Sequence, residues 1–435
     1  MNISDYRCDR GSKIYYVEQT PGIAPARTIY QHDKGEITYS KAFRRLAFKS
    51  QLITKKNEHA RSKLLHSMEV STIATEMSAL LHLDTALTEA ICLGHDAGSY
   101  PYSHIGELAV REYLGDYWEH KLTHENRGHI LLREESVVME SADPERYKKL
   151  SDTDCYPIST HPLGEKSLVT ISREVLDGIL HHQCPDYRYE NMPATVEAQV
   201  VRVADNFAYI TQELNDASEL DIEFDRYSKA SKLKCTAISP IYSVARQESI
   251  KLKTKSSTWV ALSKEAGEFK IDPKDIVSNS IGKRLNAMIY WFVGYNLKLA
   301  QEGKLPLYGS TILKKDIPQL VYPEGLSFIL DYIWAIIIRD NVHNHHLVKH
   351  NYDLAREMVL IMCKQCESLL NDYISRGATS PQKDVERLYE IVKELSGGNI
   401  GHSNKRQIMQ SIAIFISEMT DPFFERFFNR LWELF

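Results

Sequence analysis

A histidine and an aspartate stand side by side at the end of an apolar helical run, and no other feature constrains the fold so strongly. His95 and Asp96 close this run in the segment ICLGHDAGSYPYSH. Adjacent side chains on a helix point in different directions, so two that act on one object are predicted to lie where a helix ends and the backbone turns. Gly98 and Pro101 follow directly and are typical of such a turn.

Apolar residues recur at helical spacing along most of the chain, which predicts a predominantly all-α fold. An apolar stripe over residues 63–81 is followed by Asp84, which is suited to cap the helix that ends in the His-Asp pair. Further helices are predicted at residues 125–135, 167–182, 194–213, 280–300, 325–338, 353–375, 383–395 and 405–418. Residues 241–271 are the exception, because alternating polar and β-branched residues predict a small β-hairpin there.

The chain is predicted to divide into four parts. Gly, Pro and Asp recur in residues 1–39, which predicts an irregular N-terminal arm, and the segments that carry chemistry fall in a core at residues 40–230. Residues 231–302 form an extension that contains the predicted hairpin. A change in composition near residue 303 marks the start of a C-terminal helical subdomain, residues 303–435.

The composition is that of an ordinary soluble protein, with 43% hydrophobic and 26% charged residues. The net charge of −5 argues against a surface built to coat nucleic acid. No apolar stretch reaches transmembrane length and the first residues lack a signal-peptide core, so we expect a cytoplasmic protein. Seven irregularly spaced cysteines predict no disulfide framework, and Cys363 and Cys366 fit an apolar helix core better than a zinc site.

Four side chains are candidates to bind one metal ion: His66, His95, Asp96 and Asp205. Two imidazoles and two carboxylates suit Mn²⁺, Fe²⁺ or Mg²⁺ and leave positions open for water and a substrate oxygen. Each residue alone has an ordinary alternative, since a single histidine is more often a satisfied core or surface residue than a ligand. Asp96 and Asp205 lie within apolar runs, however, where an unpaired carboxylate is costly to bury.

The order His66, His95-Asp96, Asp205 resembles that of the HD-domain metal phosphohydrolases, in which the corresponding side chains bind the catalytic metal. The flanking segments narrow the resemblance to the deoxynucleoside triphosphate triphosphohydrolases, especially their dGTPase-like bacterial branch. These segments are YSKAFRRLAFKSQL, RSKLLHSMEV, HDAGSYPYSHIGE and EAQVVRVADNFAY. The C-terminal part of the chain is similar to this family only in its helical character.

The resemblance implies roles for three further residues. In this family a histidine and an acid three residues apart, here His104 and Glu107, are thought to position or activate the attacking water, and a carboxylate at that spacing can fix an imidazole tautomer. His124 is similar to a histidine that can protonate the leaving 5′-oxygen of the deoxyribose. The alternatives are a helix-capping interaction for the first pair and a solvated helix start for His124.

The resemblance also implies substrate-binding residues. Gln51 matches a glutamine near the 3′-hydroxyl, and Tyr209 matches a tyrosine whose ring lies against the deoxyribose and would collide with a 2′-hydroxyl. Arg61 and Lys63 precede His66 by about one turn and are predicted to hold triphosphate oxygens.

Two positions depart from the family pattern. Ser99 stands where most relatives carry a histidine, so one phosphate or general-acid contact is missing or supplied elsewhere. Glu213 stands where relatives carry an aspartate, and its longer side chain is expected to reshape the contact with the 3′-hydroxyl. The histidine-rich segment NVHNHHLVKH, residues 341–350, lacks regular ligand spacing and is predicted to be an exposed or interfacial helix junction.

The resemblance therefore implies a metal-dependent enzyme, with Mn²⁺ or Mg²⁺ as cofactor and Fe²⁺ as a further candidate, that cleaves a dNTP to the deoxynucleoside and inorganic triphosphate. dGTP is favoured by resemblance alone. One alternative is a catalytically weakened HD protein that binds nucleotides or single-stranded DNA, and another is an HD phosphohydrolase that acts on a different nucleotide. The resemblance also implies a homo-oligomer, commonly a hexamer or tetramer, and no membrane partner is expected.

Overall fold

The computed structural model describes residues 2–8, 28–51, 61–135, 137–139, 157–158, 167–169, 171–183, 192–219, 256–278, 280–310, 312–335, 338, 343–344, 346–376, 386, 388–390 and 405–432. Within these residues the chain is dominated by α-helices, as predicted, and carries two small antiparallel sheets. None of the helices described there is long and apolar enough to cross a membrane.

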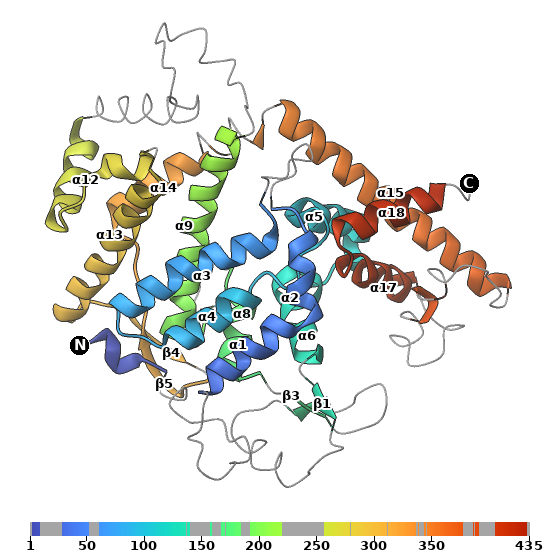
Figure 1. Cartoon of the computed structure of the whole chain (residues 1–435), viewed down its shortest axis with the longest axis horizontal. Helices are drawn as coiled ribbons and strands as arrows, with labels where there is room; N and C mark the ends of the chain where they lie inside the picture. The colour runs from blue at the N-terminus through green and yellow to red at the C-terminus, as the bar shows by residue number, and fades with distance from the viewer. Residues whose placement is uncertain are drawn as a thin grey trace, which may run out of the picture.

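Three helices form the centre of the molecule (Figure 1). They are α3 (Lys63–Leu80), α4 (Thr85–Gly94) and α9 (Val196–Glu219). Each of the three packs against the other two. α1 (Ile29–Tyr39) covers α4, while α8 (Arg173–Leu180) contacts α4, α9 and α6 (His124–Glu135). The predicted ligands on α3, α4 and α9 are therefore carried by helices in mutual contact.

The first two central helices begin where the sequence predicts them to begin. The side chain of Ser62 caps α3 by accepting a hydrogen bond from the N–H of Leu65. The carboxylate of Asp84 caps α4 by accepting hydrogen bonds from the N–H groups of Ala86 and Leu87. Each such cap stabilises its helix by ~1 kcal/mol.

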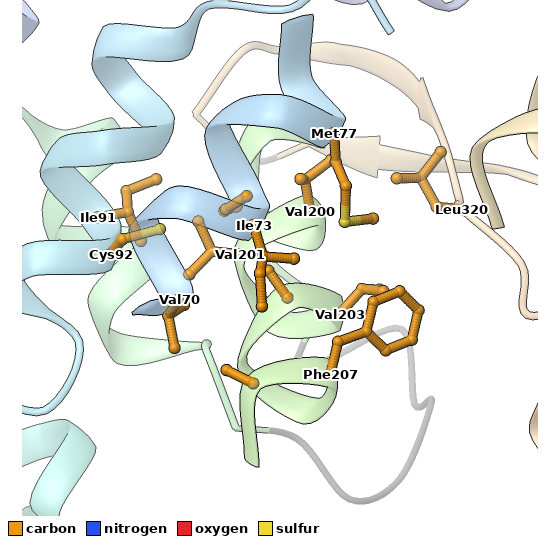
Figure 2. Close-up of a cluster of buried hydrophobic side chains, with 14 of the residues drawn as sticks. Val70, Ile73, Met77, Ile91, Cys92, Val200, Val201, Val203, Phe207 and Leu320 are labelled. Atoms are coloured by element: carbon orange, nitrogen blue, oxygen red, sulfur yellow. The ribbon is translucent and has the colours of Figure 1, made fainter. Parts of the chain in front are cut away.

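The central helices share an apolar core, part of which is drawn in Figure 2. Val70, Ile73 and Met77 recur at helical spacing along one face of α3, and all three are buried. They lie among buried side chains of α4 and α9 that include Ile91, Cys92, Val200, Val201, Val203 and Phe207. Burial of each large side chain contributes ~1.5–3 kcal/mol, so this core fixes the relative positions of the helices that carry the predicted site.

A second apolar core joins α5 to the C-terminal helices. Its helices are α5 (Ser103–Leu114), α15 (His346–Arg376), α17 (Lys405–Ser417) and α18 (Asp421–Trp432). In Figure 1 the three C-terminal helices lie together on one side of the central helices. Cys363 and Cys366 are buried in this core, as the apolar pattern around them predicts. Because α5 carries His104 and Glu107, the C-terminal helices support one wall of the predicted site.

The remaining helices are α-helices of different lengths and short 3₁₀ helices. The longer ones are α12 (Ser256–Glu268), α13 (Ile281–Gln301) and α14 (Glu324–Tyr332). The short ones are α2 (Lys41–Arg45) and the 3₁₀ helices η1 (Ile3–Tyr6), η3 (Leu46–Phe48), η4 (Gly115–Tyr117), η5 (His120–Leu122) and η7 (Pro273–Val277). α13 packs on both α3 and α9 and thereby extends the central core.

Both sheets are small. β4 (Leu307–Ser310) and β5 (Lys315–Pro318) form an antiparallel hairpin in which Tyr308 is opposite Ile317. β1 (Val137–Met139), β3 (Ser167–Val169) and β2 (Pro157–Ile158) form a sheet of strand order β1-β3-β2, antiparallel throughout. Neither sheet lies at the predicted hairpin.

The hairpin predicted at residues 241–271 is wrong wherever the structure describes that segment. Residues 256–268 form α12, whereas residues 241–255 lie outside the described residues. Leu262 and Ala266, one turn apart on α12, are both buried, and α12 packs on α14. Glu265 accepts a hydrogen bond of 3.2 Å from the indole N–H of Trp291. An apolar helical face with a tertiary partner therefore outweighs the β-branched composition.

Other boundaries also differ from the prediction. The N-terminal arm is not irregular where it is described near its end, because residues 29–39 form α1 with Tyr30 and Ile37 buried. Residues 167–169 form β3, and the helix predicted from residue 167 begins only at Arg173. α15 begins at His346 rather than at residue 353. Most of the helix predicted at residues 383–395 lies outside the described residues.

The first apolar core extends across the predicted division of the chain. Ile3, Val70, Trp291 and Leu326 all belong to it, and these residues come from the four predicted parts in turn. The division into four parts stays a prediction.

Candidate active site

His95 and Asp96 lie in the turn that follows α4, as predicted. The N–H of Ser99 closes this turn by donating to the carbonyl of Asp96 at 2.9 Å. Gly98 is required here, because a Cβ at this position would lie 2.1 Å from the backbone N of Gly128 and the backbone O of His124. The absence of a side chain lets α6 approach the turn and brings His124 close to the His-Asp pair.

The structure brings together the four side chains predicted to bind metal. Nε2 of His66 lies 3.0 Å from a carboxylate oxygen of Asp205 and 3.6 Å from one of Asp96. Nε2 of His95 lies 3.3 Å from Asp96 and 3.8 Å from Asp205. His66 comes from α3, the His-Asp pair from the end of α4 and Asp205 from α9, so the three central helices meet at this cluster.

The outer ring nitrogens of both histidines are held by hydrogen bonds. Nδ1 of His66 lies 2.8 Å from the amide oxygen of Gln212, and Nδ1 of His95 lies 2.7 Å from the carbonyl oxygen of Cys92. Both acceptors take a hydrogen bond from Nδ1, which fixes the orientation of each ring with Nε2 toward the two carboxylates. Nε2 of His95 is buried and has no hydrogen-bond partner among the described residues. Nitrogen and carboxylate donors that converge in this way fit a divalent cation.

Charges around the cluster keep both carboxylates ionised. Burial alone would raise the pKa of Asp96, but Lys63 and His95 outweigh burial and hold this pKa well below its usual range. Nζ of Lys63 lies 3.0 and 3.2 Å from the two carboxylate oxygens. Burial likewise opposes ionisation of Asp205, and the hydrogen bond from His66 together with the charge of His95 outweighs it and lowers its pKa. Ionised carboxylates are the form that binds a metal.

The side chain of Ser99 is directed toward Asp96. Its hydroxyl donates a hydrogen bond of 2.9 Å to Oδ1 of Asp96, and its side chain is buried. The residue that departs from the family pattern therefore helps to hold a predicted metal ligand.

His104, Glu107 and His124 also cluster, with one ligand-type atom of each within 4.8 Å of the others. Their pairing differs from the expected one. Glu107 accepts a hydrogen bond of 2.7 Å from Nδ1 of His124, whereas it was expected to fix the tautomer of His104. The rings of His104 and His124 lie edge to face with centroids 5.2 Å apart.

The environments of these two histidines push their pKa values apart. Loss of hydration among the surrounding protein atoms, together with the charges of Lys63 and His124, lowers the pKa of His104 to about 3. Burial would lower the pKa of His124 as well, but the carboxylates of Glu107 and Glu125 outweigh it and raise this pKa to about 9. Near neutral pH, His104 is thus neutral and His124 protonated.

His182 belongs to the cluster around His95 and was not predicted to be a site residue. One of its ring nitrogens lies within 4.8 Å of ligand atoms of His95 and Asp205, and the rings of His95 and His182 have centroids 4.9 Å apart. Nδ1 lies 2.7 Å from the carbonyl of Ile179, and Nε2 is buried with no hydrogen-bond partner in the described part of the chain. The only sequence signal was a pair of adjacent histidines at a helix end, which does not say which of the two faces inward.

A cavity of about 510 Å³ opens beside the cluster. Of the residues predicted to bind substrate, Gln51, Lys63 and Tyr209 line it, together with His66, Asp96, His104 and Asp205. Its volume is within the range of ligand sites for small molecules. The side-chain oxygen of Gln51 is buried without a hydrogen-bond partner among the described residues, so it is ready to accept a hydrogen bond from a ligand.

Two of the residues predicted to bind substrate do not line this cavity. Nε of Arg61 makes an ion pair of 3.0 Å with Glu69. Glu213 is buried and lies 3.3 Å from Nε2 of His343. Both side chains are therefore committed to protein partners.

Several lining residues were missed. Arg202 and Asn206 flank Asp205 on the exposed side of α9, and Tyr322 and Trp334 come from segments beyond the predicted core. The position of Arg202 could have been predicted from its spacing of three residues before Asp205, and that of Asn206 from its spacing of four residues after Arg202. The two aromatic residues could not, because their position depends on how distant segments fold onto α9.

Comparison with known proteins bears on the same region. Residues 64–210 match the HD domain family. The chain is 33% identical over 192 residues to a deoxyguanosinetriphosphate triphosphohydrolase-like protein of Caldanaerobacter subterraneus, an alignment that covers 44% of this chain and 46% of the relative. Proteins with the same name from Rickettsia prowazekii and Desulfatibacillum aliphaticivorans are 31% identical over 250 residues and 33% identical over 201 residues.

These alignments cover 51% and 44% of this chain and 58% and 48% of the respective relatives. The chain therefore spans about half the length of the curated relatives it matches. The matched region contains every residue of the cluster around His95. Through the segment that builds this site, the chain is similar to the HD domain family and to proteins named deoxyguanosinetriphosphate triphosphohydrolase-like protein.

Proposed function

We propose that this protein hydrolyses a deoxynucleoside triphosphate to the deoxynucleoside and inorganic triphosphate, with dGTP as the favoured substrate. The observation that carries the proposal is the cavity beside the cluster of His66, His95, Asp96 and Asp205, which also exposes His104 and the ring of Tyr209. The names of the relatives favour guanine as the base.

The metal site is proposed to consist of His66, His95, Asp96 and Asp205. Their converging lone pairs and carboxylates fit Mn²⁺ or Mg²⁺, and also Fe²⁺. A bound divalent cation supplies Lewis-acid polarisation of a phosphate oxygen. Gln212 and the carbonyl of Cys92 orient the two imidazoles.

The chemical step needs a proton acceptor for the attacking water and a proton donor for the leaving sugar. His104 lines the cavity and is held neutral, so it accepts a proton as the water oxygen bonds to the α-phosphorus. His124 is held protonated by Glu107, so it gives a proton to the 5′-oxygen as the bond between that oxygen and phosphorus breaks. The oxygen of the attacking water thus ends on the triphosphate, and the proton given by His124 ends on the deoxynucleoside.

Substrate binding is proposed to follow the lining of the cavity. Lys63 neutralises part of the triphosphate charge, and Gln51 accepts a hydrogen bond from the 3′-hydroxyl. Tyr209 provides a flat ring for the deoxyribose. Arg61 and Glu213 act indirectly in this scheme, because their side chains pair with Glu69 and His343.

One observation favours a second candidate, a nucleotide or single-stranded DNA binding protein with weakened catalysis. Nζ of Lys63 contacts both oxygens of Asp96 and competes with a cation for that carboxylate. This candidate predicts that nucleotides bind without turnover.

The test is an incubation with each dNTP and with GTP, in the presence of Mn²⁺ or Mg²⁺, followed by chromatography of the products. We expect deoxynucleoside and triphosphate from at least one dNTP, and no products from Asp205→Ala. Asp116→Ala is the matched control, since this carboxylate is exposed and does not line the cavity. Monophosphate or diphosphate products indicate another HD phosphohydrolase, and binding without products indicates the second candidate.

A further inference from the structure

The histidine-rich segment at residues 341–350 supplies a side chain that contacts two residues of the cavity wall. It was predicted to be an exposed or interfacial helix junction, and His350 and Asn344 are exposed as expected. His343 differs, since its side chain is only 21% exposed. Its Nε2 lies 3.3 Å from the carboxylate of Glu213 and 3.4 Å from the hydroxyl of Tyr209.

Glu213 and Tyr209 lie one turn apart on α9 and therefore share a face of that helix. Tyr209 lines the cavity, whereas Glu213 is buried behind it. A buried carboxylate needs a polar partner, and His343 is the partner in reach. This contact joins α9 to the segment that directly precedes α15, which begins at His346.

His343 is itself enclosed by aromatic rings. Trp334 lies edge to face with it at a centroid distance of 5.8 Å, and Tyr352 of α15 does so at 5.9 Å. Trp334 is 40% exposed and lines the same cavity as Tyr209. The imidazole therefore lies between Tyr209 and Trp334, which line the cavity, and Tyr352 of α15.

We propose that His343, anchored by Glu213, is a positioning residue that fixes the ring of Tyr209 and thereby sets how strictly the cavity excludes a 2′-hydroxyl. An N–H on Nε2 is shared between the carboxylate of Glu213 and the phenolic oxygen of Tyr209. With this bond in place, the phenol cannot swing away to make room for a ribose. The inference rests on the proposed function, because it takes Tyr209 as the surface that contacts the sugar.

The departure at Glu213 gains a physical reason from this arrangement. The side chain is one methylene longer than the aspartate of the relatives, and its carboxylate reaches His343 rather than the cavity. Sugar selection in this chain then depends on a residue that lies 130 positions after Glu213 in the sequence.

The test compares kcat/KM for dGTP and GTP in His343→Ala, Tyr209→Ala and the double variant. We expect His343→Ala to lower the dGTP-to-GTP ratio by ~tenfold, and the double variant to show no further loss beyond Tyr209→Ala, since contacting residues act non-additively. His343→Gln should recover most of the ratio, because the side-chain amide of glutamine can donate from nearly the same place. His350→Ala is the matched control and should leave the ratio unchanged.

A His343→Ala variant that loses activity equally on both sugars overturns the inference, because that result describes a purely structural role. A double variant whose dGTP-to-GTP ratio falls by the product of the two single losses also overturns the inference. If the wild-type protein turns over neither nucleotide, the proposed function fails, and the same ratio is then read from dissociation constants measured by calorimetry with Ca²⁺. A failure of His343→Ala to change that ratio, or the absence of any nucleotide binding, overturns this inference as well.

Discussion

Glu107 accepts a hydrogen bond of 2.7 Å from Nδ1 of His124, although the first residue lies on α5 and the second begins α6. The carboxylates of Glu107 and Glu125 raise the pKa of His124 to about 9 against the effect of burial. A histidine with a raised pKa stays protonated as pH rises until that pKa is reached, so an acid catalyst at this position works up to about pH 9.

Glu107→Gln should therefore shift the alkaline limb of the pH–rate profile to lower pH by ~1 unit, because one of the negative charges that stabilise the imidazolium is removed. The measurement is kcat/KM against pH for the wild type and the variant. Glu112→Gln is the control, since Glu112 lies on the same helix but pairs with Arg356 on the surface. An alkaline limb that does not move contradicts the assignment of His124 as the proton donor.

His182→Gln should weaken metal binding by ~10–100-fold, the range found when groups that support a metal centre are removed. The reason is that Nε2 of His182 is buried, lies near His95 and Asp205, and has no hydrogen-bond partner within the part of the chain that the structure describes. Mn²⁺ affinity and stoichiometry can be measured by calorimetry and by the electron paramagnetic resonance signal of the free ion. His181→Gln is the matched control, because His181 is adjacent to His182 in sequence but contacts the carboxylate of Asp177 instead. Equal affinities in the two variants speak against a role of His182 at the centre.

Glu197→Gln should change the pH dependence of stability. Oε1 of Glu197 accepts hydrogen bonds from the backbone N–H groups of Cys8 and Asp84, and burial raises the pKa of this carboxyl from 4.5 to about 7. A carboxyl whose folded pKa is raised contributes stability in its protonated form, and this contribution is lost as pH rises from the unfolded pKa through the folded one. The window is therefore about pH 4.5 to 7.

Glutamine keeps an acceptor for both N–H groups and does not ionise. Relative to wild type, the variant should gain up to ~3 kcal/mol in free energy of unfolding between pH 5 and pH 8. Urea denaturation at these two pH values measures the difference. A free-energy difference between variant and wild type that is the same at both pH values would show that Glu197 does not titrate in this range.

Asp421→Ala should destabilise the protein and loosen two parts of the site together. The carboxylate accepts hydrogen bonds from the backbone and hydroxyl of Ser50, at 2.9 and 2.7 Å, and from the N–H of Tyr102 at 3.0 Å. Ser50 precedes Gln51, and Tyr102, in a left-handed conformation with φ 60°, starts the helix that carries His104.

Removal of Asp421 leaves two backbone N–H groups without their acceptor, at a cost of ~2–4 kcal/mol in free energy of unfolding. Asp421→Asn keeps one carboxamide oxygen as an acceptor and should lose about half as much. Thermal unfolding orders the three proteins. If asparagine and alanine are equally harmful, the hydrogen bonds are not the cause.

The centre of the site could be predicted from sequence because its residues break a local pattern. Asp96 and Asp205 are carboxylates inside apolar helical runs, and the turn after His95 is marked by glycine and proline. The residues that complete the site do not interrupt the local sequence pattern in this way. Glu107 pairs with His124 and Glu213 with His343 through contacts between separate helices, and neither pairing follows from sequence spacing.

The same reasoning explains the errors in the fold. The segment at residues 256–268 contains residues that also suit strands, so its composition did not predict a helix. Its packing on α14, with Leu262 and Ala266 buried on one helical face, decides the structure. α1 was missed because its buried residues, among them Asp33 and Tyr30, include polar atoms that find partners only in the folded chain. Local patterns thus identify long apolar helices, and tertiary partners decide the rest.

In the proposed reaction, water attacks the α-phosphorus and the bond between this phosphorus and the 5′-oxygen breaks. Hydrolysis of dGTP in ¹⁸O-labelled water, with the products analysed by mass spectrometry, tests it directly. The arrangement of His104 and His124 predicts that the label enters the triphosphate and that the deoxynucleoside remains unlabelled. Label in the deoxynucleoside would place the attack at carbon, whereas labelled monophosphate or diphosphate would show that a bond other than the one to the 5′-oxygen breaks; either result contradicts the proposed reaction.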